Sequence, residues 1–193
     1  MPLILASASP RRRQLLALLG RPFSVQPANV DERAICAPGP AALAQALARA
    51  KCLAVAAARP GDTVIGCDTV VDVDGRVLGK PENRADAVRM MQLLSGRGHL
   101  VHTGVAVARG RTVLVQCETT RVCFAQLSPQ EIADYADTPE PYDKAGGYGI
   151  QGYAARFVSG IQGCYFNVVG QPVHRLYEML QQIDKISSEF CKK

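Results

Sequence analysis

Short apolar and β-branched runs divide this chain into segments that are typical of β-strands. They lie at residues 3–6, 23–25, 63–73, 76–78, 100–108, 112–124 and 165–169. Asp74 and Gly75 separate two of these runs, and such a two-residue link predicts a hairpin with a tight turn. The last run is the clearest part of a strand region that follows a glycine-rich segment.

Apolar residues at helical spacing predict five helices among these strands. They cover about 10–19, 40–58, 84–94, 129–135 and 172–183. Ser9 followed by Pro10 is a strong start signal for the first helix, and Ser128 with Glu131 forms a capping box at the fourth. Because strands and helices mix without strict alternation, the pattern indicates a mixed α/β fold rather than a regular doubly wound sheet.

The composition adds a size and a core to this picture. The 193 residues are 48% hydrophobic and 20% charged, which is enough to bury a sizeable core and excludes global disorder. We expect one domain over residues 1–184 and a solvated C-terminal tail over residues 185–193. No apolar run reaches the roughly 18 residues of a membrane span. The formal charge of +5 suits an anionic partner without identifying one.

Two features bear on the cellular compartment. The seven cysteines are scattered without a C-x-x-C pair, so we expect reduced thiols in a cytoplasmic protein rather than disulfides or a zinc site. Residues 1–20 carry serine and arginine but no acid, as a transit peptide or twin-arginine signal would. The same residues also fit the pattern of a strand, a turn and a helix, and we therefore expect them to be mature structure.

The segment from Ser7 to Arg13 combines hydroxyl and guanidinium groups with the start of a helix. A helix N-terminus offers free N–H groups and the positive end of the helix dipole. Arginine adds forked, charge-assisted hydrogen bonds, so the segment predicts a phosphate site. A capped helix with a solvated basic face explains the same residues equally well.

Asp68 interrupts an otherwise apolar strand, where aspartate is rare and a buried carboxylate is costly. The functional interpretation is a metal ligand, or a general base aimed at an attacking water. The alternative is a structural aspartate at a bulge or turn, and we favour the functional role. Asp72 and Asp74 flank the hairpin and are expected to be solvated turn residues.

Two later segments resemble nucleotide-binding loops without matching them. Gly79-Lys80-Pro81 lacks the Walker spacing and has proline where a magnesium-binding hydroxyl would stand, so we reject a P-loop and keep Lys80 as a point charge for phosphate. The glycines of residues 147–152 fit the dinucleotide spacing, but no clear strand precedes them and no acid follows to hold a ribose. They would instead let backbone approach a ligand, and the Gln151 amide could contact a base.

Four separated motifs together resemble the Maf family of nucleotide pyrophosphatases. They are SASPRR at 7–12, CDTVV at 67–71, GKP at 79–81 and DKAGGYGIQG at 143–152, and the likeness runs in order from Leu3 to about Ile183. It implies a fold related to the inosine triphosphate pyrophosphatases, with a central mixed sheet, flanking helices and a cleft between two lobes. It also implies hydrolysis of a nucleoside triphosphate between its α and β phosphates with a divalent cation, Mg²⁺ or Mn²⁺.

The resemblance assigns roles to individual residues. Asp68 corresponds to the catalytic proton acceptor, and Asp68 with Glu32 would hold the metal. The phosphate-binding positions would be Ser7, Arg11, Arg12, Lys51 and Lys80. Further charged cleft positions are Glu32, Asp143 and Lys144. Cys67, beside the key aspartate, departs slightly from the pattern and would add redox sensitivity.

Three positions select a branch of the family. The branch acting on dTTP and UTP shows Arg, Thr and Gln, which correspond to Arg11, Thr69 and Gln151 here, whereas the 7-methyl-GTP branch shows Trp, Gln and Glu. A neutral glutamine can pair with the acceptor and donor edge of uracil or thymine. The resemblance therefore implies a dTTP/UTP pyrophosphatase, with modified pyrimidine nucleotides as further substrates.

A regulator of septum formation, binding nucleotide or nucleic acid without catalysis, is the alternative hypothesis. It would need a basic stripe with interleaved aromatic residues, and the chain is only 6% aromatic. We expect a nucleoside triphosphate as the partner, no membrane and no nucleic acid, and a homodimer is compatible with the sequence.

Overall fold

The computed structural model describes residues 2–190. Within them the strands form one seven-stranded sheet in the order β2-β1-β3-β5-β6-β7, with β4 paired to β3. The strands are β1 (Leu3–Leu5), β2 (Phe23–Val25), β3 (Thr63–Val73), β4 (Arg76–Leu78), β5 (Gly98–Arg109), β6 (Thr112–Phe124) and β7 (Val158–Gln162). β1 pairs in parallel with β2 and β3, whereas the other pairs are antiparallel. The predicted mixed α/β fold with a central mixed sheet is confirmed.

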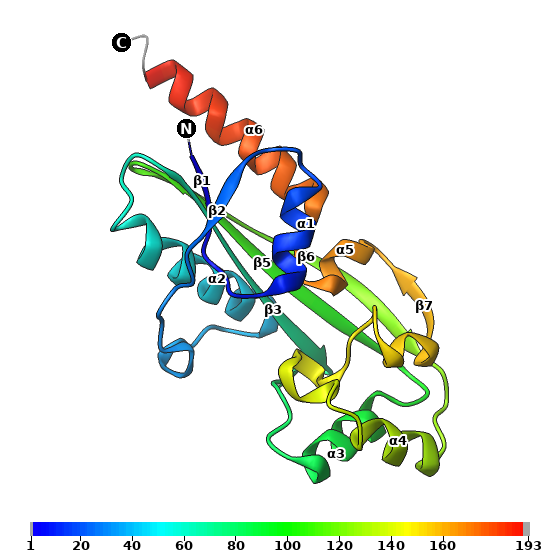
Figure 1. Ribbon diagram of the computed structural model, residues 1–193. Helices are drawn as coiled ribbons and strands as arrows, with labels where there is room; N and C mark the ends of the chain where they lie inside the picture. The colour runs from blue at the N-terminus through cyan, green and yellow to red at the C-terminus, as the bar shows by residue number, and fades with distance from the viewer. Residues whose placement is uncertain (1, 191–193) are drawn as a thin grey trace.

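Helices cover both faces of this sheet, as Figure 1 shows. They are α1 (Pro10–Ala17), α2 (Pro40–Ala56), α3 (Arg84–Leu94), α4 (Pro129–Ala136), α5 (Tyr165–Val169) and α6 (Val173–Phe190), joined by the 3-10 turns η1 (Glu32–Ala34), η2 (Pro141–Asp143), η3 (Ala145–Gly147) and η4 (Tyr153–Phe157). Ala48 and Cys52 of α2 pack on one face of the sheet, and Leu176 and Met179 of α6 pack on the other. α3 and α4 lie together at the far end of the long strands.

Helix α2 lies unusually close to the sheet because two strand residues have no side chain. A Cβ atom added at Gly66 of β3 would stand 2.7 Å from the backbone nitrogen of Cys52. One added at Gly104 of β5 would stand 2.7 Å from the backbone nitrogen of Gln45. Both glycines therefore allow the helix backbone to rest directly on the strands.

One edge of β3 has a gap in its pairing. β5 covers the opposite edge from Thr63 to Asp72. On the edge facing the gap, β1 pairs with residues 63–65 and β4 pairs with residues 71–73. Residues 66–70, which include Asp68, therefore have no strand neighbour on that edge, and a ligand can approach them there.

Two predictions about the C-terminal third are wrong. Residues 165–169 form helix α5, and the strand lies earlier, at β7. The apolar run is typical of a strand. In the structure, however, the Asn167 amide donates to Val101 O and Thr120 Oγ1, and these bonds hold the segment against the sheet as a helical turn. Glycine at position 170, with φ of 121°, ends it.

The last helix also extends beyond its predicted end near Ile183. Residues 185–190 of the predicted tail belong to α6, and residues 191–193 lie outside the described residues. Arg21 and Arg109 both pair with Asp184, and Arg109 also donates to Ser187 Oγ. These contacts hold the polar continuation of the helix against the sheet. None of the helices within residues 2–190 is long and apolar enough to cross a membrane.

Candidate active site

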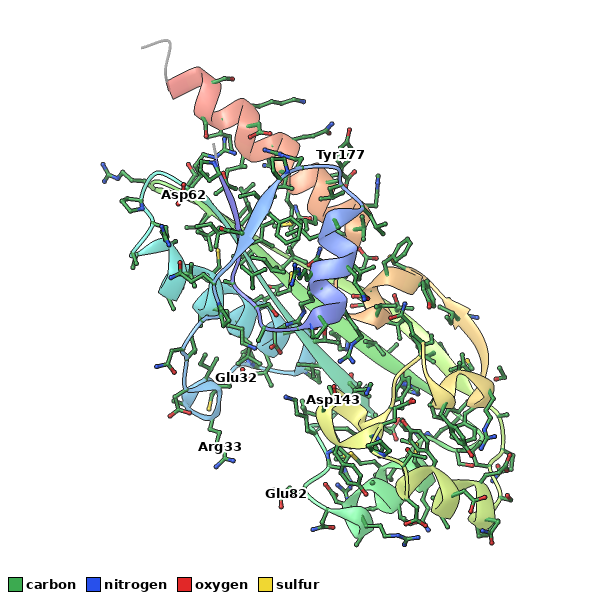
Figure 2. All side chains as sticks on the ribbon, viewed as in Figure 1. Glu32, Arg33, Asp62, Glu82, Asp143 and Tyr177 are labelled. Carbon is green, nitrogen blue, oxygen red and sulfur yellow. The ribbon has the colours of Figure 1, made fainter. Side chains whose placement is uncertain are left out.

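A cavity of about 1030 Å³ opens beside the gap in β3. Its walls come from the start of α1, from η1 and α2, from β3 and the β4 hairpin, and from the segment between α4 and η4. Glu32, Glu82 and Asp143 lie around its rim and come from three different parts of the chain (Figure 2). The cavity therefore gathers segments that are far apart in the sequence around one strand residue, Asp68.

Most of the residues that the sequence singled out line this cavity. They are Arg11, Arg12, Glu32, Lys51, Asp68, Thr69, Lys80, Asp143, Lys144 and Gln151. Ser7 does not reach the lining, because its hydroxyl accepts hydrogen bonds from the Ser9 backbone and from Arg12. The structure thus brings the predicted set together and places Ser7 just behind it.

Asp68 forms the centre of an ion-pair triad. Its Oδ1 lies 2.5 Å from Lys51 Nζ, and the same nitrogen lies 2.8 Å from Glu32 Oε1. Lys51 lies within the part of α2 that rests on Gly66 and Gly104, between Ala48 and Cys52, so the close helix–strand contact brings its amine over the strand. Asp68 is only 8% exposed, and Lys51 supplies the opposite charge that such a buried carboxylate needs.

Arg12 fastens the start of α1 to the rest of the site. Its Nε donates to Gly170 O at 2.9 Å, and its terminal nitrogens donate to Ser7 Oγ at 3.3 Å and to Thr69 Oγ1 at 3.1 Å. Three of the five guanidinium N–H groups are therefore used within the protein, which leaves two for a ligand. Arg12 combines a structural clamp with its predicted place beside phosphate.

Thr69 belongs to a directed chain of hydrogen bonds. Thr103 Oγ1 donates to Asn167 O, so in its 3.0 Å contact with Thr69 it must accept the Thr69 proton. Thr69 in turn accepts from Arg12. With its own proton committed, the Thr69 hydroxyl can only accept a further hydrogen bond from a ligand.

The remaining predicted cations are Arg11, Lys144 and Lys80. Arg11 forms a 3.6 Å ion pair with Asp143, which links the start of α1 to the η2 segment across the cavity. Lys144 donates to Asp143 and to the Glu140 carbonyl. Lys80 is exposed at the edge of the cavity, after the β3–β4 hairpin.

The charges around the cavity balance. The basic side chains that line it are Arg11, Arg12, Arg33, Lys51, Lys80 and Lys144. The acidic side chains are Asp31, Glu32, Asp68, Glu82, Glu140 and Asp143. A lining with as many carboxylates as cations does not by itself neutralise a polyanion, so a polyanionic ligand would need additional positive charge here.

Two acidic residues in and near the cavity have contacts that the sequence did not indicate. Glu140 lines the cavity and accepts hydrogen bonds from two backbone N–H groups, and no motif pointed to it. Asp72 is buried rather than solvated, because it accepts from Gly75 N at 2.7 Å and lies 3.3 Å from His102 Nε2. A network of this kind depends on contacts between strands, which local sequence does not record.

The expected redox sensitivity of Cys67 does not fit its environment. The side chain is fully buried, and burial raises its pKa to about 11. Because the thiolate is the reactive form, this cysteine stays protonated and inert near neutral pH. The six cysteines within the described residues are all free, as predicted, and Cys191 lies outside those residues.

Comparisons of the sequence with known proteins agree on one family. The family model described as Maf-like protein matches residues 2–183. A dTTP/UTP pyrophosphatase from Koribacter versatilis is 53% identical over 182 residues, which cover 94% of this chain and 94% of that protein. One from Symbiobacterium thermophilum is 54% identical over 180 residues, which cover 93% of each chain. Among solved structures, the Staphylococcus aureus Ham1 protein gives a TM-score of 0.48 at 16% identity, over 65% of this chain and 72% of that one.

Proposed function

This chain belongs to the Maf family, and we propose that it hydrolyses dTTP and UTP to the monophosphate and pyrophosphate. Relatives about half identical to it over almost their whole length are named as dTTP/UTP pyrophosphatases. The observation that carries the proposal is Asp68, a carboxylate paired with Lys51 in a cavity that also holds arginines for phosphate. A pyrophosphatase needs this combination of a base and anion-binding groups.

In the proposed reaction, Asp68 orients a water molecule and accepts its proton as the water oxygen attacks the α-phosphorus. The bond between this phosphorus and the bridging oxygen breaks, and pyrophosphate leaves. Lys51 holds the Asp68 carboxylate in place, at 2.5 Å. The two free N–H groups of Arg12, together with Arg11 and Lys80, bind the phosphates as their charge shifts.

The donor set fits a divalent metal. Glu32 and Asp68 lie on either side of one cation, Lys51, and both offer hard carboxylate oxygens. Mg²⁺ characteristically takes one or two carboxylates and completes its shell with phosphate oxygens and water. Within the described residues no three acidic, histidine or cysteine side chains cluster, so the metal would depend on the substrate for its remaining ligands. Bound there, Mg²⁺ or Mn²⁺ would supply the positive charge that the balanced cavity lacks.

In this proposal, Gln151, Thr69 and Arg11 select the nucleobase of the substrate. Gln151 lies at the exposed edge of the cavity, where its amide can offer a donor and an acceptor to uracil or thymine. Thr69 can only accept, and would therefore favour a ligand that presents an N–H group. These roles support a pyrimidine nucleotide with an imide edge.

A nucleotide panel in ¹⁸O-labelled water tests the proposal. We expect the purified protein to release pyrophosphate from dTTP and UTP faster than from CTP, GTP or 7-methyl-GTP. The ¹⁸O should appear in the monophosphate, because attack occurs at the α-phosphorus. Activity should require Mg²⁺ or Mn²⁺ and should disappear with EDTA.

Other results of the same experiment would contradict the proposed function. Release of orthophosphate, or label in the pyrophosphate, would place the attack at another phosphorus. A protein with no turnover on any nucleotide, but with salt-dependent affinity for DNA, would instead support the regulatory alternative.

A further inference from the structure

We propose that Glu140 is a positioning residue that fixes the loop carrying Gln151, and so sets base selectivity without touching the base. The inference rests on the proposed function, because it concerns how the same cavity chooses its nucleotide. Glu140 lies between α4 and η2, eleven residues before Gln151, and lines the cavity. It lies outside the four motifs that carry the family resemblance.

The Glu140 carboxylate holds the backbone that directly follows Gln151. Oε2 accepts from Tyr153 N at 2.7 Å, and Oε1 accepts from Ala154 N at 3.2 Å and from the Tyr135 hydroxyl at 3.2 Å. Both oxygens thus accept from protein donors, and these contacts tie Glu140 to the loop. Hydrogen bonds from N–H groups to an ionised carboxylate are stronger than neutral ones.

Two glycines of the loop leave the space that this carboxylate occupies. A Cβ atom at Gly152 would stand 2.7 Å from Glu140 Oε1. A Cβ atom at Gly149 would stand 2.7 Å from Lys144 Cε and 3.4 Å from Glu140 Oε1. The glycine spacing of this segment, which failed as a dinucleotide motif, therefore fits the close approach of Glu140 and Lys144 to the chain.

Lys144 holds the backbone of Glu140. Its Nζ donates to the Glu140 carbonyl at 2.7 Å, so it ties Glu140 to the η2–η3 segment. Tyr135, whose hydroxyl donates to Glu140, is fully buried and its ring stacks on Tyr153. Lys144 and Tyr135 therefore hold Glu140, and the Glu140 carboxylate holds the backbone that follows Gln151.

Fixing this loop matters because a glutamine amide can pair with uracil or, after turning over, with cytosine. A fixed backbone limits the directions from which the Gln151 amide can reach the base, and this restriction favours one of the two pairings. Gln151 is exposed and lies two residues before the first backbone N–H that Glu140 accepts. Loosening that anchor should leave the chemistry at Asp68 intact and reduce the preference for UTP.

The variant Glu140→Gln tests this, because the side chain keeps its size but retains only one accepting oxygen. We expect the ratio of kcat/KM for UTP over CTP to fall about tenfold, mainly through KM, with kcat for UTP nearly unchanged. The matched control is Glu131→Gln, whose carboxylate also accepts a backbone N–H, at the α4 capping box outside the cavity. The control should lower stability and leave the UTP/CTP ratio unchanged.

A double-mutant cycle with Gln151→Ala separates positioning from a general loss of structure. In the Gln151→Ala background, Glu140→Gln should cause no further loss of the UTP/CTP ratio, because both changes act on one recognition element. Additive losses would overturn the proposal. So would a fall in kcat at an unchanged ratio, or a ratio that falls equally in the Glu131→Gln control.

Tyr135→Phe keeps the proposal testable should Glu140→Gln fail to fold. It removes one of the three donors to the carboxylate and preserves the buried ring, so the ratio should fall in the same direction but less. An unchanged ratio in folded Tyr135→Phe would, in that case, count against Glu140. Failure of the wild type to hydrolyse UTP would reject the proposed function itself, whereas an active wild type with unaltered variants would reject only the positioning role.

Discussion

Several residues of this protein place a charged or polar side chain in a buried position, where it is energetically costly. Asp68 is stabilised by Lys51, and Asp72 by Gly75 and His102. Removing one partner of such a pair leaves the other unpaired, which costs more than the pair itself contributes. The buried polar residues near the cavity are therefore sensitive to substitution.

His99 provides a pH test at this scale. Its Nε2 lies 2.7 Å from the hydroxyl of Tyr148, which lines the cavity, and its ring packs against Phe124. Burial, with the nearby Arg121 and Arg97, lowers the pKa of His99 to about 4. In the unfolded chain the pKa is the ordinary 6.5. Between these values the unfolded chain binds the extra proton, so acidification favours unfolding.

We therefore expect the contribution of His99 to stability to be complete above about pH 6.5 and to be lost as the pH falls towards 4. The loss should reach about 3 kcal/mol in the free energy of unfolding. Urea unfolding at a series of pH values measures it, with His99→Gln as the control that cannot titrate. Wild type and control with parallel profiles over this window would show that His99 is not buried as described.

At the scale of elements, the position of α2 determines the site. The helix rests on Gly66 and Gly104, and this contact brings Lys51 to Asp68. The sequence predicted the helix from apolar residues at helical spacing, and β3 from a long run of apolar and β-branched residues. It could not predict their separation, since nothing local shows that two strand glycines face a helix backbone rather than solvent.

Gly104→Ala tests this contact. The added methyl group would meet backbone atoms of Ala44 and Gln45, which cannot rotate away. We expect a loss of about 1–3 kcal/mol in the free energy of unfolding, as in other overpacked cores. UTP hydrolysis should fall as well, since Lys51 moves with the helix. Gly110→Ala is a poor control because of its positive φ, whereas Gly160→Ala meets no atom within 4 Å and should change neither property.

The strand prediction for residues 165–169, which form α5, is wrong for a related reason. Residues 165–169 have the apolar and β-branched composition of a strand, but Asn167 anchors them to β5 and β6 as a helix. Tyr165 and Phe166 stay 40% exposed as a result. Short apolar runs are ambiguous between strand and helix, and here long-range hydrogen bonds decide between them.

At the scale of the whole molecule, one cavity draws its residues from almost the entire chain. Local chemistry pointed to some of these residues, such as the aspartate within an apolar strand, whereas Glu32 and Lys51 were indicated only by the family resemblance. The sequence did not reveal that Arg12 is a clamp, that Glu140 anchors a loop, or that the lining carries balanced charge. Those properties arise only when distant segments meet.

The central claim is that Asp68 accepts the proton of the attacking water. Steady-state kinetics of UTP hydrolysis by Asp68→Asn tests it most directly, because asparagine keeps the shape and the contact with Lys51 but cannot take up a proton. We predict a fall in kcat on the order of 10²–10⁴-fold with KM changed little. A folded Asp68→Asn protein that turns over UTP at the wild-type rate would contradict the account.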